Sequence, residues 1–173
     1  SAAKIVLKFE RESGIQLSKD LNVLIKVKAK FDPQYGFSVN VEDIDSSYTL
    51  GDIARRYMQI VERLTSEGLI NKNKSLPTPF DIQNVLVIAP ENAAGLGDFK
   101  KDADALDKAG VCHFVYHTAT FQGNTAAASI TESLSTALRQ WASNFNAAPD
   151  LIVIIRGGGA VNDLAYLNDY DLA

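Results

Sequence analysis

Hydrophobic and polar residues follow two different patterns along the chain, and the change falls near residue 78. Residues 4–45 alternate apolar and polar in short stretches around a turn at residues 32–36, which predicts a small β region. Apolar residues then recur at helical spacing and predict a helix over residues 50–67, capped near Thr49. A proline-bearing connector follows this helix, because proline cannot continue a helix.

The second half of the chain alternates between apolar runs and helix-like segments. The runs at residues 85–88, 111–116 and 151–155 are near-continuous, as expected of parallel strands covered on both faces. Between them, residues 98–109 and 126–145 have helical periodicity, and Trp141 falls on the apolar stripe of the second segment; residues 161–172 predict one more helix. This order predicts an α/β fold with a doubly wound, mostly parallel, three-layer core.

Composition narrows the class of protein. The 173 residues suffice for one sizeable domain with a smaller attached piece. A net charge of -4 excludes a protein that binds nucleic acid through overall charge, so any such contact must be local. Cys112 is the sole cysteine, which excludes an intrachain disulfide and a CxxC metal site. No apolar run approaches the roughly 18 residues of a membrane span, and we expect a soluble, cytoplasmic protein.

Three loops carry the candidate chemistry, because functional groups collect outside the carboxyl ends of parallel strands. Arg156 leads into Gly157, Gly158 and Gly159, whose backbone N–H groups could hold a phosphate or carboxylate. Asp98 and Gln122 follow the two earlier strands. An arginine, an amide and a carboxylate at one edge suit a polyanionic substrate. Two simpler interpretations stay open: a tight strand-to-helix turn with a surface arginine, and Asp98 as a helix N-cap.

Four sequence stretches resemble the large subunit of bacterial exodeoxyribonuclease VII. They are YTLGDIARRYMQIVERLTSEGLINKNKSLPTP at 48–79, VIAPENAAGLGD at 87–98, FQGNTAAASI at 121–130 and RGGGAVNDLAYLND at 156–169. The resemblance implies a partial OB-fold-like segment at residues 1–47, a helix and linker at residues 48–78, and a nuclease core at residues 79–173. It also implies that the chain is a piece of a longer, divergent member.

The resemblance assigns residues to the site. Asp98 and Arg156 match positions expected to be catalytic. Expected phosphate or substrate contacts are Gly157, Gly158, Gly159, Gln122, Gly123, Asp163, Asn168 and Asp169. The chain departs from the family pattern at Ala160, Asn162, Ala165 and Leu167, where Ser, Glu, Trp and Phe are usual. We expect no cofactor and no metal site, since His113 and His117 fit no known ligand spacing.

The implied activity is hydrolysis of single-stranded DNA from its ends to oligonucleotides, with weak or no activity in this piece alone. A small subunit is the implied protein partner, bound through regions outside this chain. Phe31, Tyr35 and Phe37 could stack bases, and Lys26 and Lys28 could contact phosphates. Aromatic packing within a β layer and ordinary solvated lysines explain the same residues.

Two other functions stay open at this point. One is a non-catalytic module of the same fold that binds phosphate or nucleic acid through the glycine loop. The other is a small-molecule enzyme of the doubly wound class that acts on an acidic substrate. Binding of single-stranded DNA that depends on Arg156 and falls steeply with salt would favour the nuclease.

Overall fold

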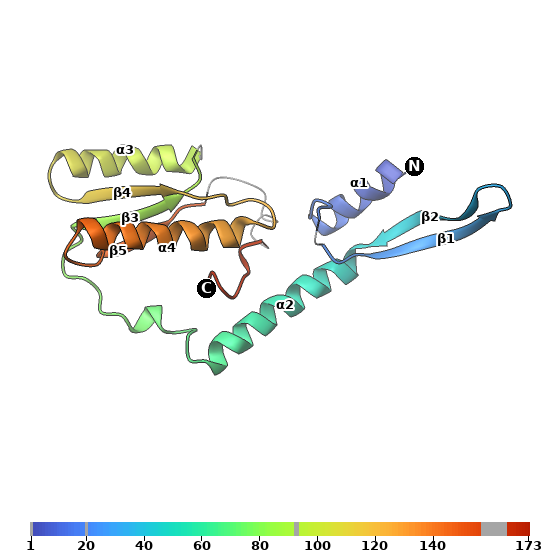
Figure 1. Ribbon diagram of the computed structural model, residues 1–173, viewed down its shortest axis with the longest axis horizontal. Helices are drawn as coiled ribbons and strands as arrows, with labels where there is room; N and C mark the ends of the chain where they lie inside the picture. The colour runs from blue at the N-terminus through green and yellow to red at the C-terminus, as the bar shows by residue number, and fades with distance from the viewer. Residues whose placement is uncertain (1, 20, 92–93, 157–165) are drawn as a thin grey trace. The chain divides into compact units, whose positions relative to one another are not determined.

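The computed structural model describes residues 2–19, 21–91, 94–156 and 166–173 (Figure 1). The chain forms two compact units, residues 1–63 and residues 64–173, and the division falls near the end of a long helix. The sequence pattern changes later, near residue 78. Because the structural division comes earlier, the linker belongs to the second unit. The assignment of these parts as an OB-fold-like segment and a nuclease core stays a prediction.

The first unit begins with a helix, α1 (Ala2–Ser13), where the sequence pattern predicted a β region. That prediction is wrong for these residues. Ile5 and Phe9 lie one helical turn apart, and Phe9 is 1% exposed, so one face of the helix is buried. Gly14, with φ of 68°, ends the helix. Alternation of apolar and polar residues over 4–45 predicted strands here, but burial of one helical face overrides that local pattern.

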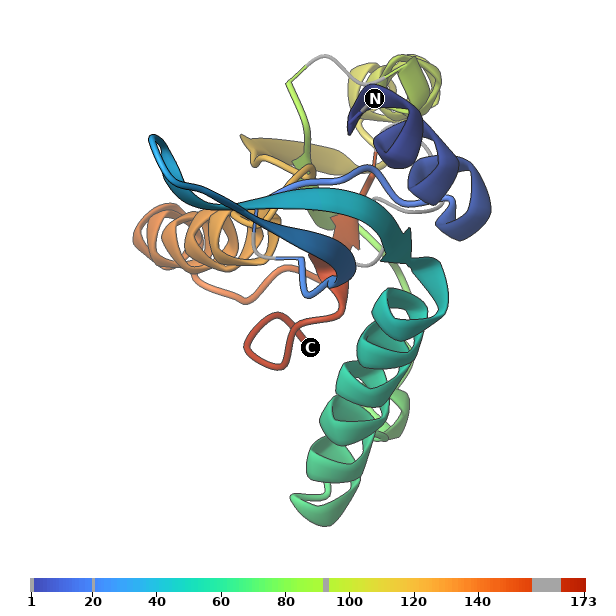
Figure 2. The ribbon, with the colours of Figure 1, turned by 90° about the vertical axis from the view of Figure 1, so that its right-hand side faces the viewer.

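The β region is a two-stranded antiparallel hairpin of β1 (Leu24–Asp32) and β2 (Gly36–Asp45). It appears as a twisted ribbon in Figures 1 and 2. The predicted turn is confirmed: the Asp32 carboxylate accepts backbone N–H bonds from Gln34 at 2.9 Å and Tyr35 at 3.1 Å. Gly36 completes the turn with φ of +78°, a conformation that L side chains rarely adopt.

Helix α2 (Ser46–Ser66) follows the hairpin directly and starts earlier than the predicted residue 50. Asp45 caps it, because its Oδ1 accepts the backbone N–H groups of Ser47 at 2.9 Å and Tyr48 at 3.2 Å. Thr49, the predicted cap, is instead buried and donates its hydroxyl to the carbonyl of Asn22 at 3.0 Å. A short 3₁₀ turn, η1 (Asn73–Ser75), lies in the exposed stretch after α2.

The second unit confirms the predicted α/β fold. Its parallel sheet contains β3 (Asn84–Ala89), β4 (His113–Thr118) and β5 (Leu151–Ile154), in the order β4-β3-β5. Helices α3 (Ala94–Lys108) and α4 (Ala126–Asn144) connect the strands and lie on opposite sides of the sheet (Figures 1 and 2). The chain moves from central β3 to one edge and then to the other, and right-handed crossovers in opposite directions place helices on opposite faces.

Alternate residues of β3 build two separate cores. Leu86 and Ile88, both 0% exposed, pack with Ile130 and Trp141 of α4. Val85 and Val87 pack on the other face with Leu96 of α3. The period of two along the strand therefore sends neighbouring residues into different layers. Because both faces of β3 are covered, its sequence is an uninterrupted apolar run.

The last predicted helix is the main error in this unit. Of the predicted span 161–172, residues 161–165 lie outside the described part of the chain. Residues 166–172 contain a 3₁₀ turn at Tyr166 and Leu167 and a further turn, not an α-helix. The Asp169 carboxylate accepts the backbone N–H groups of Asp171 at 2.9 Å and Leu172 at 3.2 Å, and this local bonding competes with helix formation.

Candidate anion-binding edge of the parallel sheet

The three parallel strands end at the same edge of the sheet, and the loops with the predicted site residues begin there. Helices α3 and α4 start at this edge, since each follows a strand of the sheet. The first turns of both helices contain no acidic residue. Because helix N-termini carry partial positive charge, the edge favours an anion. The loops after the neighbouring strands β3 and β4 lead to helices on opposite faces of the sheet. In doubly wound folds, ligands usually bind at the point where two adjacent strands diverge in this way.

The loop between β4 and α4 is fixed by one buried aromatic side chain. Phe121 is 4% exposed and belongs to the core beneath α4, and the Thr120 backbone N–H donates to Ser129 Oγ at 2.9 Å. With Phe121 held inward, the next residue, Gln122, is exposed. Gly123 then adopts φ of +74°. The predicted Gln-Gly pair thus lies at the carboxyl edge, with the amide of Gln122 open to a ligand.

Arg156 leaves the end of β5 at the same edge. The backbone N–H of Ile155 donates to the carbonyl of Ile88 at 2.8 Å, which holds the chain against β3 up to the residue before Arg156. Arg156 itself is half-buried. Four other predicted residues, Gly157, Gly158, Gly159 and Asp163, lie outside the described residues.

Asp98 does not cap a helix. It lies inside α3, which begins at Ala94, and its side chain is exposed. Four residues at about 1.5 Å each set it roughly 6 Å along the helix from that start. The N-cap alternative is therefore wrong, and Asp98 is an exposed carboxylate close to the carboxyl edge.

The remaining predicted contacts lie near the C-terminal end of the chain. Asn168 is exposed, and Asp169 is half-buried. The neighbouring Tyr170 hydroxyl hydrogen-bonds the carboxylate of Glu67 within the same unit. Asp169 therefore forms the local turn in this structure, and a role for it in binding substrate stays a prediction.

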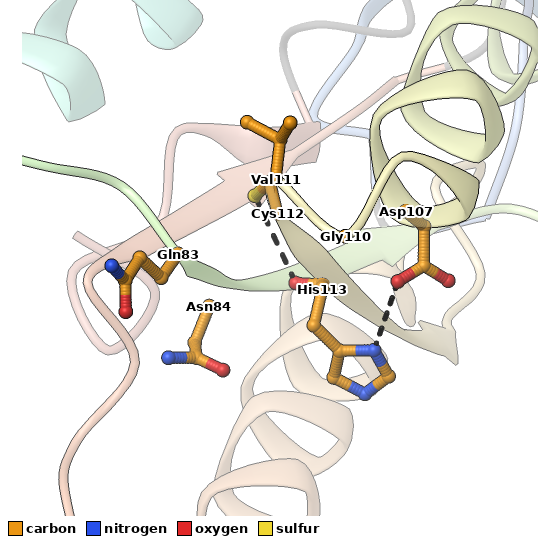
Figure 3. A pocket seen from close by; sticks show the side chains of 7 residues that line it. All are labelled: Gln83, Asn84, Asp107, Gly110, Val111, Cys112 and His113. Atoms are coloured by element: carbon orange, nitrogen blue, oxygen red, sulfur yellow. Dashed lines mark hydrogen bonds and ion pairs between the residues drawn. The ribbon is translucent and has the colours of Figure 1, made fainter.

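A pocket of about 310 Å³ lies at the opposite, amino edge of the sheet (Figure 3). Its lining residues are Gln83, Asn84, Asp107, Gly110, Val111, Cys112 and His113. His113 Nδ1 lies 3.2 Å from Asp107 Oδ1, and burial raises the pKa of the Cys112 thiol. Within the described ranges, no group of three or more His, Cys, Asp or Glu side chains could hold a metal ion.

The hairpin separates the predicted DNA contacts. Lys26 and Lys28 lie on one face of β1, whereas Phe31 and its cross-strand neighbour Phe37 lie on the other. Tyr35 sits in the turn and is 81% exposed. Strand alternation therefore assigns the lysines and the two phenylalanines to different faces of the hairpin.

Tyr116 and Lys100 form a contact that the sequence did not reveal. The Lys100 Nζ atom lies 4.8 Å from the centre of the Tyr116 ring, on the side of the sheet covered by α3. Burial raises the pKa of Tyr116, and its hydroxyl has no hydrogen-bond partner in the described part of the chain. In the sequence, the one feature that could have indicated this contact is the position of Tyr116 inside an apolar strand run.

The fold defines a doubly wound α/β protein whose candidate anion site lies at the carboxyl ends of its strands. Residues 69–173 match the family model described as "Exonuclease VII, large subunit", which covers more than half of the chain. The chain therefore belongs to the exonuclease VII large-subunit family, as its sequence motifs predicted.

Curated relatives support the same family. The chain is 49% identical over 161 residues to the exodeoxyribonuclease 7 large subunit of Deinococcus radiodurans, covering 93% of this chain and 38% of that protein. It is 31% identical over 144 residues to the Helicobacter pylori protein of the same name, covering 82% of this chain and 32% of that one. The chain thus spans about a third of the length of these relatives.

No helix in the described ranges is both long and apolar enough to cross a membrane.

Proposed function

We propose that this chain is part of an exodeoxyribonuclease large subunit that hydrolyses phosphodiester bonds of single-stranded DNA from its ends, releasing oligonucleotides. The family match is the observation that carries the proposal. The carboxyl edge supports it physically, because two helix N-termini and Arg156 favour a phosphate there. The finer parts of the proposal are a cytoplasmic location, a role in DNA repair, an OB-fold-like DNA-binding segment and a small-subunit partner.

Each residue at this edge has a role in the proposed reaction. Arg156 and the backbone N–H groups of Gly157–Gly159 bind the scissile phosphate and offset the negative charge that builds in the transition state. Gln122 and Gly123 bind a neighbouring part of the DNA backbone. Asp98 orients the attacking water or takes its proton, since an exposed carboxylate can accept one. Asp163, Asn168 and Asp169 belong to the same proposed substrate surface.

Digestion of end-labelled DNA by the full-length protein with its small subunit, in a chelator, tests the proposal. We expect single-strand-specific cleavage that falls by about 10²–10³-fold in Arg156→Ala and by about 10²–10⁴-fold in Asp98→Ala. Asp102→Ala and Arg139→Ala remove the same charges from exposed positions on α3 and α4 and should leave the rate unchanged. Absence of cleavage by the wild-type protein would favour a phosphate-binding module instead.

A further inference from the structure

Between β4 and α4, the chain is held at three consecutive residues just before Gln122. The backbone N–H of Ala119 donates to the carbonyl of the last residue of β3 at 3.1 Å, which extends the pairing of these strands by one residue. The backbone N–H of Thr120 donates to Ser129 Oγ at 2.9 Å. Phe121 is buried in the core beneath α4. These three contacts fix where the chain leaves the sheet and the direction in which Gln122 projects.

The Ser129 contact differs from the other two in what it contributes. The strand pairing of Ala119 and the burial of Phe121 both belong to the packing of the second unit. Thr120, in contrast, is exposed, so water would satisfy its N–H if Ser129 offered no acceptor. Loss of this hydrogen bond therefore has a small effect on stability. What the bond determines is the direction of the backbone two residues before Gln122.

The Ser129 hydroxyl is presented from a packed part of α4. Ala126 and Ala127, the first two residues of that helix, are 0% and 8% exposed. The backbone N–H of Ser129 donates to the carbonyl of Thr125 at 2.9 Å, and the residue itself is half-buried. A side chain on a packed helix has a better defined position than one on a loop. Ser129 is therefore a fixed point against which the preceding loop is oriented.

The loop is also held on the other side of Gln122. Gly123 adopts φ of +74°, a conformation that L side chains rarely adopt. Its carbonyl accepts the backbone N–H of Ala126 at 3.2 Å, so the turn closes directly on the start of α4. The exposed Gln122 thus stands between two contacts with the same helix, one through the Ser129 hydroxyl and one through the Gly123 carbonyl.

We propose that Ser129 is a positioning residue of the nuclease: through the Thr120 N–H it orients the loop so that the Gln122 amide meets the DNA backbone beside the scissile phosphate. This inference rests on the proposed function, because it concerns how the substrate is held at the same edge. Ser129 acts through Gln122 and does not itself contact DNA. Because Gln122 binds a part of the DNA that does not react, its contact is equally strong in the bound substrate and in the transition state. Loss of such a contact raises KM and leaves kcat unchanged.

Separate kcat and KM values for digestion of end-labelled single-stranded DNA by the full-length protein with its small subunit test the proposal. Ser129→Val and Ser129→Thr are a matched pair, because both side chains are β-branched and of similar size and only threonine retains the hydroxyl. We expect Ser129→Val to raise KM by about two- to tenfold, the effect of one neutral hydrogen bond, with kcat unchanged. Ser129→Thr should keep the wild-type KM. Ser135→Val, at an exposed position on α4, should leave both constants unchanged.

A double-mutant cycle with Gln122 distinguishes positioning from a general loss of structure. Gln122→Ala alone should raise KM by about tenfold or more, since a hydrogen bond to a charged phosphate is stronger than a neutral one. Adding Ser129→Val to Gln122→Ala should change KM by less than about twofold, because the oriented amide is already absent. A structural defect would instead raise KM by the same factor in both backgrounds. Ser129→Ala removes the hydroxyl without adding methyl groups and should match Ser129→Val, and circular dichroism verifies the fold of each variant.

The proposal is overturned if Ser129→Val and Ser129→Ala keep the wild-type KM, if Ser129→Thr loses as much as Ser129→Val, or if the effects of Ser129→Val and Gln122→Ala on KM multiply. In each of these cases, wild-type cleavage that depends on Arg156 leaves the nuclease proposal standing. If the wild-type protein cleaves no DNA, the nuclease proposal fails and the positioning role fails with it. The wild-type rate therefore distinguishes the two failures.

Discussion

In the second unit, the burial and the contacts of a residue depend on the layer into which its side chain projects. Trp141 is 3% exposed, stacks on Phe145 with ring centres 4.3 Å apart, and donates its indole N–H to the carbonyl of Ala147 at 2.9 Å. Its place on an apolar helical stripe predicted a core residue, and the structure confirms this. The hydrogen bond to Ala147 was not predictable, because it depends on how the loop after α4 folds back.

Truncation of Trp141 tests its role in the core. Trp141→Ala should lower the free energy of unfolding by about 3–5 kcal/mol, because it removes a large buried side chain and leaves a cavity. Trp141→Phe keeps a ring beside Phe145 and loses the indole hydrogen bond, so the smaller loss should include about 1 kcal/mol from that bond. Urea unfolding followed by circular dichroism measures both. Equal losses in the two variants would contradict the contribution of ring packing.

At the scale of elements, the helices and strands of the second unit up to β5 followed from periodicity, while the helix predicted at residues 161–172 and several boundaries did not. The apolar run at 111–116 predicted a strand that the structure shifts to His113–Thr118. Helix α2 begins at Ser46, since Asp45 accepts three hydrogen bonds through one carboxylate oxygen. Caps are single side-chain contacts, and a repeat of apolar residues contains no information about them.

The cap of α2 gives the first unit a predictable response to acid. A hydrogen bond from the Ser47 hydroxyl, with the backbone N–H of Tyr48, lowers the pKa of Asp45 below its ordinary value. A carboxyl group with a lowered pKa stabilises the fold above that ordinary value of about 3.9, and the contribution is lost as pH falls through the folded-state pKa. Asparagine caps a helix without a charge.

Asp45→Asn should therefore make stability less dependent on pH below about 4. Thermal unfolding at pH 6 and pH 3, followed by circular dichroism, compares the variant with the wild type. Some acid dependence should persist, because Lys8 lowers the pKa of Asp43. Asp102→Asn, at an exposed position on α3, is the charge-matched control. If the loss of thermal stability between pH 6 and pH 3 is as large in Asp45→Asn as in the wild type, this interpretation of the cap is wrong.

At the scale of the whole molecule, the chain consists of two compact units joined through the end of α2. All residues from 71 to 83 are exposed, and the 3₁₀ turn Asn73–Ser75 is the one regular element among them. Exposed segments with little regular hydrogen bonding are preferred sites of proteolysis. In contrast, Lys28 and Lys30 are exposed but lie within a paired strand.

Limited trypsin digestion should consequently cut first after Lys72 or Lys74, with products identified by mass spectrometry. Lys72→Gln/Lys74→Gln removes both cleavage sites and should slow the first cut without changing the circular dichroism spectrum. Initial cleavage at Lys28 or Lys30 in the wild-type chain would show instead that the hairpin opens more readily than this connecting segment.

The sequence by itself determined the α/β class, the order of the elements between residues 84 and 154 and the family, because these depend on apolar periodicity and on motifs read along the chain. Tertiary structure decided that residues 2–13 form a helix, that Asp98 lies within α3, and that the lysines and aromatics of the hairpin occupy separate faces. Each of these depends on contacts between residues distant in sequence, or on a register, and local propensity contains neither.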